Sequence, residues 1–336
     1  MSTKYIKKMA ISKYRLIKDL RNIGVEEGDH VGVALSFKSI GYVKDGPDAF
    51  IESLLEAIGF KGTIMMPTYT RSFHYSKIRF TKNCHVYDFR STPALTGLVP
   101  ETFRKNFKTI RSMHPTHSVA AIGKKARYLI DGHNEKSRIF LPYSKLAKIR
   151  GKVLCIGIGD RVVAIRHEAQ CLAGLLNIVP QKKGVKFRDN LGIINTFIGE
   201  NWPGCVERLP ELVQDLRKKG LVTDGMIGNA RSILVPAKDF LENTSEMLRD
   251  DPTLNLCDRI SCLWCRELER RMSLYDKIDN PRYFQRNVLI IKIIEVINWF
   301  RLHNYLIGEI TNKILKILHN TFLTDPINRI LNKVFQ

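Results

Sequence analysis

Several side chains that can carry protons are gathered in one short stretch of the chain. Residues 111–121 read RSMHPTHSVAA, so that His114 precedes Pro115 and His117 follows shortly after it. The ordinary pKa of imidazole lies close to neutrality, so either histidine can accept or donate a proton at physiological pH. The same residues can instead be loop histidines that hydrogen-bond to the backbone, and both interpretations stay open at this point.

His167 is a second candidate for proton transfer. The apolar run KVLCIGIGD at 152–160 has the glycine-rich end typical of a strand, and AIRHEAQCL at 164–172 then reads as a helix. On the first turns of such a helix, an imidazole can take a proton from an amine or from water. A plain surface histidine beside a glutamate is the commoner case at such a position.

Both candidates stand at the ends of predicted strands. Proline favours an extended conformation in the residue before it, and the small residues at 118–123 read as a strand that ends at a glycine. α/β proteins place reacting groups at the ends of their strands. We therefore expect His114, Ser118 and His167 to line one functional region.

Helices and strands alternate along the chain up to about residue 237, which predicts an α/β fold. Helices are predicted at 10–23, 47–58, 97–106, 124–131, 164–175 and 207–219, and strands at 30–36, 62–67, 118–122 and 152–158. Residues 221–236 are predicted to form paired strands that close the core. Residues 70–95 are predicted to be a long loop, which either covers the surface or lies over a binding site.

A series of short segments between residues 10 and 237 carries a family resemblance. The segments are Gly28-Asp29, SFKSIGY at 36–42 with Gly46-Pro47, GTIMMPT at 62–68, Thr92-Pro93 with Thr96-Gly97, ETFR at 101–104, the stretch at 111–121, SKL at 144–146 and GMIGNA at 225–230. In this order they resemble the aminoglycoside 3-N-acetyltransferase family, also called the antibiotic N-acetyltransferases. No single segment is decisive, whereas their shared order is specific.

The resemblance implies a transferase that uses acetyl-CoA. Members of the family transfer an acetyl group to an amine of an aminosugar by direct attack of the amine on the thioester, and their action on aminoglycosides gives antibiotic resistance. The implied fold is α/β with a central mixed sheet and helices on both faces. It is unrelated to the commoner Gcn5-type acetyltransferases.

The resemblance also implies roles for matched positions. His167 matches the general base, and His114 is expected to orient or line the catalytic site. Thr68 and Ser118 match positions that line the coenzyme. The pantetheine and phosphates of the coenzyme are expected at the turn after the first strand, formed by Ser36, Phe37, Lys38 and Ser39. Backbone amides in such a turn can hold phosphate or an oxyanion, although serine and glycine between a strand and a helix are also ordinary turn residues.

The chain departs from the family pattern at two places that bear on catalysis. Where the family has His-Ser-Ser-Leu, this chain has ALSF at 34–37, so an apolar pair replaces a polar pair near the coenzyme. Where the family has a carboxylate three residues after the histidine, this chain has Gln170. Loss of that carboxylate weakens the base and its orientation, unless Glu168, Asp160 or a later residue takes its place.

Charge and composition restrict the ligands. The formal net charge of +21 suits anions such as coenzyme A, whereas nucleic acid is not an expected partner because no recognisable nucleic-acid motif accompanies the basic residues. Aminoglycosides are polycations that suit an acidic cleft. The charge therefore favours an amino-sugar acceptor that is neutral or linked to phosphate, such as a nucleotide-linked or surface-glycan sugar.

The chain is expected to have two parts. Residues 1–237 are predicted to form the acetyltransferase-like α/β domain and residues 238–336 a helical C-terminal extension. Apolar residues recur at helical spacing between 287 and 319, which indicates amphipathic helices that pack on the core or on a second copy of the chain, or else contact a membrane surface. No signal peptide or bilayer-spanning run is recognisable, so a cytoplasmic location is expected.

Three of the seven cysteines, Cys257, Cys262 and Cys265, have a C-x4-C-x2-C spacing. The spacing resembles plant-type iron–sulfur ligation, but a fourth cysteine at a suitable distance is absent and the segment reads as one helix. No metal is therefore expected.

Two functions remain open. The first is an acetyl-CoA-dependent N-acetyltransferase with His167 as its base. The second is a catalytically weakened protein of the same fold that binds or organises partners, which the changes at 34–35 and at Gln170 favour.

Overall fold

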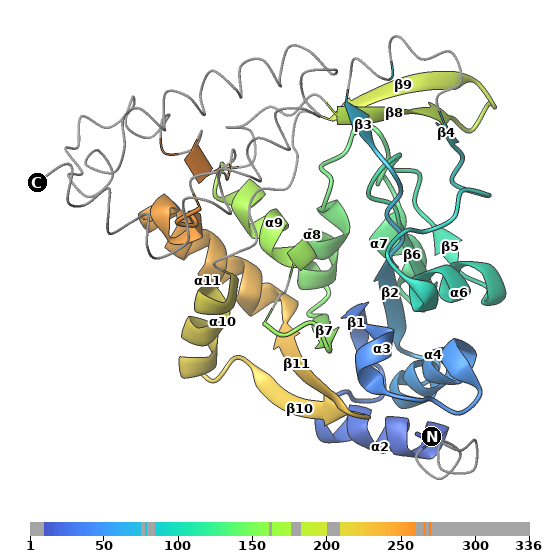
Figure 1. Cartoon of the computed structure of the whole chain (residues 1–336), viewed down its shortest axis with the longest axis vertical. Coiled ribbons are helices and arrows are strands. Elements are labelled where there is room, and N and C mark those ends of the chain that lie inside the picture. Colours follow the sequence, from blue (N-terminus) through green and yellow to red (C-terminus); the bar gives the residue numbers. More distant parts are fainter. Residues whose placement is uncertain are drawn as a thin grey trace, which may run out of the picture.

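A computed structural model of the chain describes residues 10–74, 78, 85–160, 163–175, 183–199, 209–259, 262, 265, 266 and 269 (Figure 1). Among these residues, a seven-stranded mixed sheet with the strand order β10-β11-β7-β1-β2-β6-β5 forms the centre of the molecule. β1 (His30–Leu35) pairs in parallel with both β2 (Thr63–Pro67) and β7 (Lys152–Ile156). The other strands pair antiparallel and are β5 (Ile110–Arg111), β6 (Val119–Gly123), β10 (Thr223–Ile227) and β11 (Ala230–Pro236).

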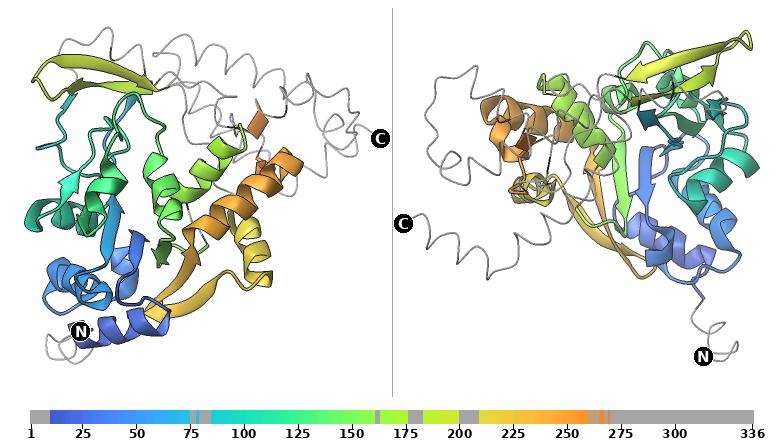
Figure 2. Two further views of the ribbon diagram at one scale, coloured as in Figure 1. Left: turned by 180° about the vertical axis from the view of Figure 1, so that it is seen from behind. Right: turned by 45° about the horizontal axis from the view of Figure 1, so that its top comes forward.

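Helices cover both faces of this sheet, as Figures 1 and 2 show. One apolar cluster joins one face of the sheet to α2 (Lys13–Asn22), α4 (Gly46–Ile58) and α6 (Leu98–Asn106). A second joins the other face to α7 (Ala126–Ile130), α8 (Leu141–Lys148), α9 (Val163–Leu172), α10 (Leu209–Lys218) and α11 (Ala237–Asp250). Successive strand residues alternate between the clusters, because Ile64 and Met66 contribute to the first and Met65 to the second. The predicted fold, a central mixed sheet with helices on both faces, is therefore confirmed.

A smaller second sheet lies at the top of the view in Figure 1. It consists of β3 (Phe73–His74), β4 (Val86–Tyr87), β8 (Lys183–Arg188) and β9 (Ile194–Gly199). The prediction of one long loop at 70–95 was wrong in this respect, because two short stretches of that segment pair with β8. The hairpin of β8 and β9 was not predicted.

Most other predicted elements are present within a few residues of their expected ends. The short helix α3 (Phe37–Ile40) and α8 were not predicted. α8 begins at Leu141-Pro142, and proline in a first helical turn loses no intrahelical hydrogen bond. This helix matters because it supplies contacts to the loop and helix that carry His167.

The expected domain boundary at 237/238 stays a prediction. α11 begins at that point and packs against α8 and α9, and the 3-10 helix η2 (Pro252–Asn255) follows it. The predicted amphipathic helices at 287–319 lie outside the described residues. Within the described part of the chain, no helix is both long and apolar enough to cross a membrane.

Candidate active site

The strand order brings the predicted site residues to one edge of the central sheet. β1, β2 and β7 are parallel, so their carboxyl ends lie at the same edge, and Leu35 stands beside Ile156 in the register. β6 runs the other way and begins at this edge, where Val119 pairs with Pro67. The turn at 36–39, Thr68, the stretch at 114–118 and the loop after β7 therefore all start from neighbouring strand ends.

The turn at 36–39 is held against the loop after β7. Ser39 donates a hydrogen bond to Ser36 Oγ at 2.9 Å, and its hydroxyl lies 3.3 Å from the carbonyl oxygen of Gly157. Lys38 and Ser39 are exposed, whereas Ser36 and Phe37 are partly buried. A Cβ at Gly157 would stand 2.5 Å from Ser39 Cβ, and the φ of Gly157 is +65°, so only glycine fits this approach without strain.

The apolar pair that replaces the family's polar pair is part of the core. Ala34 and Leu35 end β1 and pack against opposite apolar clusters, Leu35 against the first and Ala34 against the second. The change at these positions therefore extends the two cores toward the site.

Thr68 and Ser118 lie in a buried polar network around Arg111. Thr68 Oγ1 is 3.1 Å from Ser118 Oγ, and Ser118 Oγ donates to the Thr68 carbonyl oxygen at 2.8 Å. Arg111 Nε donates to both hydroxyl oxygens, at 3.2 Å for Thr68 and 3.0 Å for Ser118. Its other nitrogens donate to the carbonyl oxygens of Thr68 and Thr92, at 2.8 and 2.5 Å. Both hydroxyls are fully buried and bind one another and Arg111.

His114 caps the turn that it begins. Its Nδ1 accepts hydrogen bonds from the backbone N–H groups of His117 at 3.1 Å and Thr116 at 3.4 Å. Nδ1 is thus an acceptor in the folded protein, and the ring proton belongs to Nε2. The ring is fully buried, stacks on His133 at a centroid distance of 4.9 Å, and meets Phe197 of β9 edge-on at 5.2 Å.

His114, His117 and His133 form a buried histidine cluster. Burial lowers the pKa of His117 and of His133 to about 3, and it lowers the pKa of His114 well below its usual range, with the neighbouring rings adding to the effect on His114 and His117. The Ser112 hydroxyl lies 2.9 Å from Nδ1 of His133, and the carbonyl oxygen of Ile139 lies 3.0 Å from Nε2. These rings are neutral at pH 7, and such weakly basic groups are poor proton acceptors there.

His167 is connected to this cluster through Phe140. The Phe140 ring stacks on His167 at 5.4 Å and meets His117 edge-on at 5.4 Å. His167 is 2% exposed, and its Nδ1 lies 2.5 Å from Oε1 of Gln170, one helical turn along α9. An amide oxygen only accepts hydrogen bonds, so Nδ1 donates and Nε2 keeps its lone pair.

The substitutes considered for the missing carboxylate have other partners. Oε1 of the buried Glu168 accepts from Arg138 at 2.6 Å and from Ser144 of α8 at 2.5 Å. Asp160 accepts from Arg217 at 2.9 Å. Gln170 itself therefore occupies the position of the carboxylate and bonds to the histidine.

Reasoning from the sequence did not identify His133 or Phe140 as neighbours of the site. Both lie in a segment whose motifs carry no chemistry, and only packing brings their rings beside His114 and His167. The role of Arg111 was also missed, although its partly buried guanidinium, with several carbonyl partners, is what joins the two strand ends.

The histidine cluster predicts how stability depends on pH. Below pH about 6.5 the unfolded chain protonates these histidines while the folded chain resists protonation down to about pH 3, so stability is complete above 6.5 and falls as the pH is lowered. Each histidine contributes about 1.4 kcal/mol per pH unit to this slope. Urea unfolding at several pH values should give a smaller slope for His133→Asn than for wild type. The exposed His85→Asn serves as the control, and equal slopes for all three proteins would contradict the account.

Comparison with known proteins agrees with this architecture. The model of the family described as aminoglycoside 3-N-acetyltransferase matches residues 33–249. Aminoglycoside N(3)-acetyltransferase IV of Salmonella is 27% identical over 252 residues, which cover 73% of this chain and 90% of that protein. The crystal structure of the apoenzyme of aminoglycoside acetyltransferase AAC(3)-IVa is 26% identical, with a TM-score of 0.66 over 78% of this chain and 97% of that one. AAC-IIIb, solved as a binary complex with CoASH, shares the fold at 22% identity and a TM-score of 0.64, covering 71% of this chain and 97% of its own. The chain therefore belongs to the aminoglycoside 3-N-acetyltransferase family, whose members are acetyl-CoA-dependent acyltransferases.

Proposed function

We propose that the protein transfers the acetyl group of acetyl-CoA to an amine of an amino sugar, with His167 as general base. The contact that supports this most directly is the hydrogen bond of 2.5 Å between Nδ1 of His167 and Oε1 of Gln170. It orients the ring and places the proton of the neutral imidazole on Nδ1, which is the tautomer in which Nε2 can act as the base. The histidine cluster, whose pKa values are strongly lowered, is less suited to this role.

The reaction follows from this arrangement. The ammonium of the acceptor first loses one proton to solvent. Nε2 of His167 then takes a second proton from the neutral amine as its nitrogen attacks the thioester carbonyl carbon. The tetrahedral intermediate collapses with cleavage of the C–S bond, and the imidazolium returns the proton to the leaving sulfur. The products are the N-acetylated sugar and CoA thiol, and the histidine regains its neutral form.

The neutral amide of Gln170 has a consequence for the base. A carboxylate at this position would attract the imidazolium and favour the protonated form of the histidine. Gln170 orients the ring through the same hydrogen bond without that charge.

The coenzyme is assigned to the turn of Ser36, Phe37, Lys38 and Ser39. Lys38 and Ser39 are exposed beside the loop after β7, and Lys38 is a cation suited to phosphate. The AAC-IIIb structure with CoASH is one precedent for coenzyme binding on this fold. Thr68 and Ser118 act by fixing the ends of β2 and β6, because their hydroxyls are fully buried in the Arg111 network. His114 fixes the turn that carries His117 beside Phe140, so it positions the site and does not exchange protons.

The family of this chain assigns the acceptor to the amino sugars. The net charge of the chain favours amino sugars that are neutral or linked to phosphate. The net charge of +21 opposes a polycationic acceptor. Relatives in the same family are named for aminoglycosides, and a structure of AAC-VIa is bound to sisomicin. Both classes therefore belong in the test.

The proposed reaction predicts release of CoA thiol that depends on an amine and on His167. Acetyl-CoA is mixed with a panel of aminoglycosides and nucleotide-linked amino sugars, and thiol release is followed for wild type, His167→Ala and His30→Ala. His30 begins β1 at the opposite edge of the sheet. Loss of the base should lower kcat/KM by about 100-fold or more, while His30→Ala stays close to wild type.

Four outcomes of this experiment are informative. A preference for nucleotide-linked sugars supports the assignment by charge, and a preference for aminoglycosides overturns that part alone. Equal rates in wild type and His167→Ala contradict the assigned base. Coenzyme binding without turnover of any amine favours the alternative of a catalytically weakened binding protein.

A further prediction concerns the turn at 36–39, to which the coenzyme is assigned, and uses two glycines with similar backbone angles. Gly157 and Gly159 have φ values of +65° and +62°, but only at Gly157 would an added Cβ meet described side chains, Ser39 at 2.5 Å and Ala230 at 3.3 Å. Both alanine variants should lose about 1 kcal/mol of stability from the backbone. Only Gly157→Ala should also displace the turn and raise KM for acetyl-CoA, by roughly tenfold for a loss of about 1.4 kcal/mol. An unchanged KM for acetyl-CoA in Gly157→Ala, at a stability similar to that of Gly159→Ala, would contradict the assignment of the coenzyme to this turn.

A further inference from the structure

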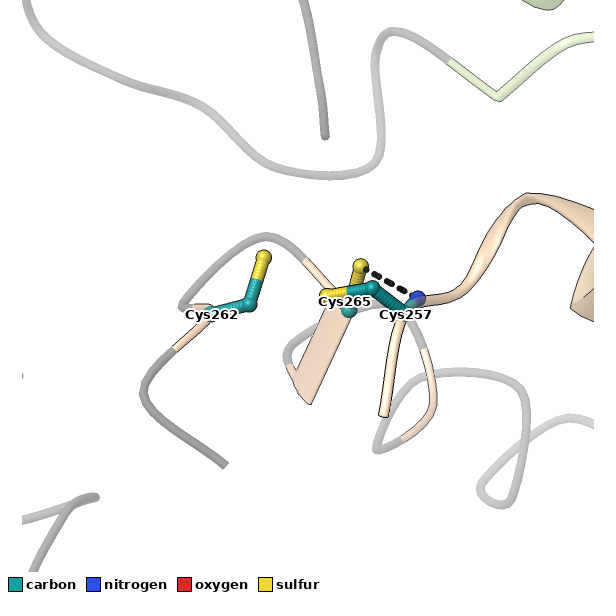
Figure 3. A group of neighbouring side chains, drawn as sticks. All are labelled: Cys257, Cys262 and Cys265. Carbon is teal, nitrogen blue, oxygen red and sulfur yellow. Dashed lines mark hydrogen bonds between the residues drawn. The ribbon is translucent and has the colours of Figure 1, made fainter. Parts of the chain in front are cut away.

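The three cysteines with the C-x4-C-x2-C spacing come together after α11. The sulfur atoms of Cys257, Cys262 and Cys265 all lie within 4.8 Å of one another (Figure 3). The segment is not the single helix that the sequence pattern indicated, because Cys257 and Cys262 lie in non-helical backbone and Cys265 in a helical turn. The chain therefore folds back so that three thiols face one point.

The separation of the sulfurs favours a single metal ion over an iron–sulfur cluster. A tetrahedral ion with metal–sulfur distances of about 2.3 Å places its sulfur ligands about 3.8 Å apart, and the sulfur atoms of this group all lie within 4.8 Å of one another. In a cubane cluster each cysteine binds a different iron atom, so the sulfurs stand further apart. The arrangement therefore fits one small thiophilic ion with little movement.

The surroundings stabilise thiolates at this point. The backbone N–H of Cys257 donates to Sγ of Cys265 at 3.2 Å, and such donors favour the charged form of sulfur (Figure 3). The guanidinium of Arg266 lies beside the group and donates to the carbonyl oxygen of Cys257 at 2.5 Å. Three thiolates and one divalent cation have a net charge of −1, and they would lie beside an arginine whose guanidinium also pairs with Glu269 at 2.6 Å.

The exposure of the three residues suits an ion that enters from solvent and is then retained. Cys257 and Cys265 are buried, at 3% and 0% exposure, whereas Cys262 is partly exposed. The group follows η2, which packs on α11, and α11 packs on α9, the helix of His167. An ion held here would fasten the chain that leaves α11 against the acetyltransferase core.

We propose that Cys257, Cys262 and Cys265 bind one Zn²⁺ ion as thiolates. Binding displaces the three thiol protons to solvent, forms three zinc–sulfur bonds and involves no oxidation or reduction. Three protein ligands and one solvent molecule complete a tetrahedral shell. The site lies outside the assigned catalytic residues and does not depend on the proposed function.

The test uses the full chain, purified without chelator or immobilised metal. Metal analysis of wild type should give about one zinc ion per chain, and Cys262→Ser should lose most of it. Cys171→Ser is the matched control, because Cys171 is also partly exposed and lies outside the group. Protein stripped of metal and titrated with Co²⁺ should develop the absorption of tetrahedral cobalt thiolate and release protons, with saturation at about one equivalent.

Stability gives a second readout that does not need a variant. Removal of zinc by a chelator should lower the midpoint of thermal unfolding by roughly 5 °C or more, and added Zn²⁺ should restore it. The proposal is overturned if wild type and Cys262→Ser contain equally little zinc and the stripped protein gives no cobalt–thiolate absorption. Iron with acid-labile sulfide in the wild-type protein overturns it as well, in favour of a cluster.

Discussion

The site depends on the partly buried guanidinium of Arg111. A cation that is partly removed from water needs several acceptors, and Arg111 has carbonyl oxygens of Thr68 and Thr92 and the hydroxyl of Ser118. Burial lowers its pKa from the usual value, which marks the cost that these acceptors offset. Because the acceptors come from three separate segments, this interaction fixes the ends of β2 and β6 relative to one another. The stretch at 111–121, which carries His114 and His117, begins at this arginine.

Two kinds of histidine then share one region with different chemistry. The rings of the buried cluster have lowered pKa values, and each bonds to a backbone or hydroxyl group through at least one nitrogen. Phe140 packs against both His117 of this cluster and His167. His167 is instead oriented on α9 by Gln170, which bonds to its Nδ1. In the proposed mechanism, the histidine cluster positions the site and α9 carries the base, His167.

The sequence allowed the family, the mixed sheet and most helices to be predicted, because apolar periodicity and ordered motifs depend on local residues. The partner of His167 could not be predicted from the sequence. The sequence shows that Gln170 stands where the family has a carboxylate, but not that Gln170 bonds to the ring. His133 and Phe140 belong to no motif and reach the site through packing. The hairpin of β8 and β9 did carry a signal, alternating residues around the turn RDNLG, which was overlooked. The strands at 73–74 and 86–87 are too short to produce one.

The central claim is that Gln170 holds the proton of His167 on Nδ1 and leaves Nε2 as the base. Proton–nitrogen correlation NMR of protein with labelled histidine measures this directly, with His167→Ala used to assign the signals. At pH 7 the account predicts a neutral ring with a protonated Nδ1 and an unprotonated Nε2. The opposite tautomer, or a ring that is already charged, would contradict it.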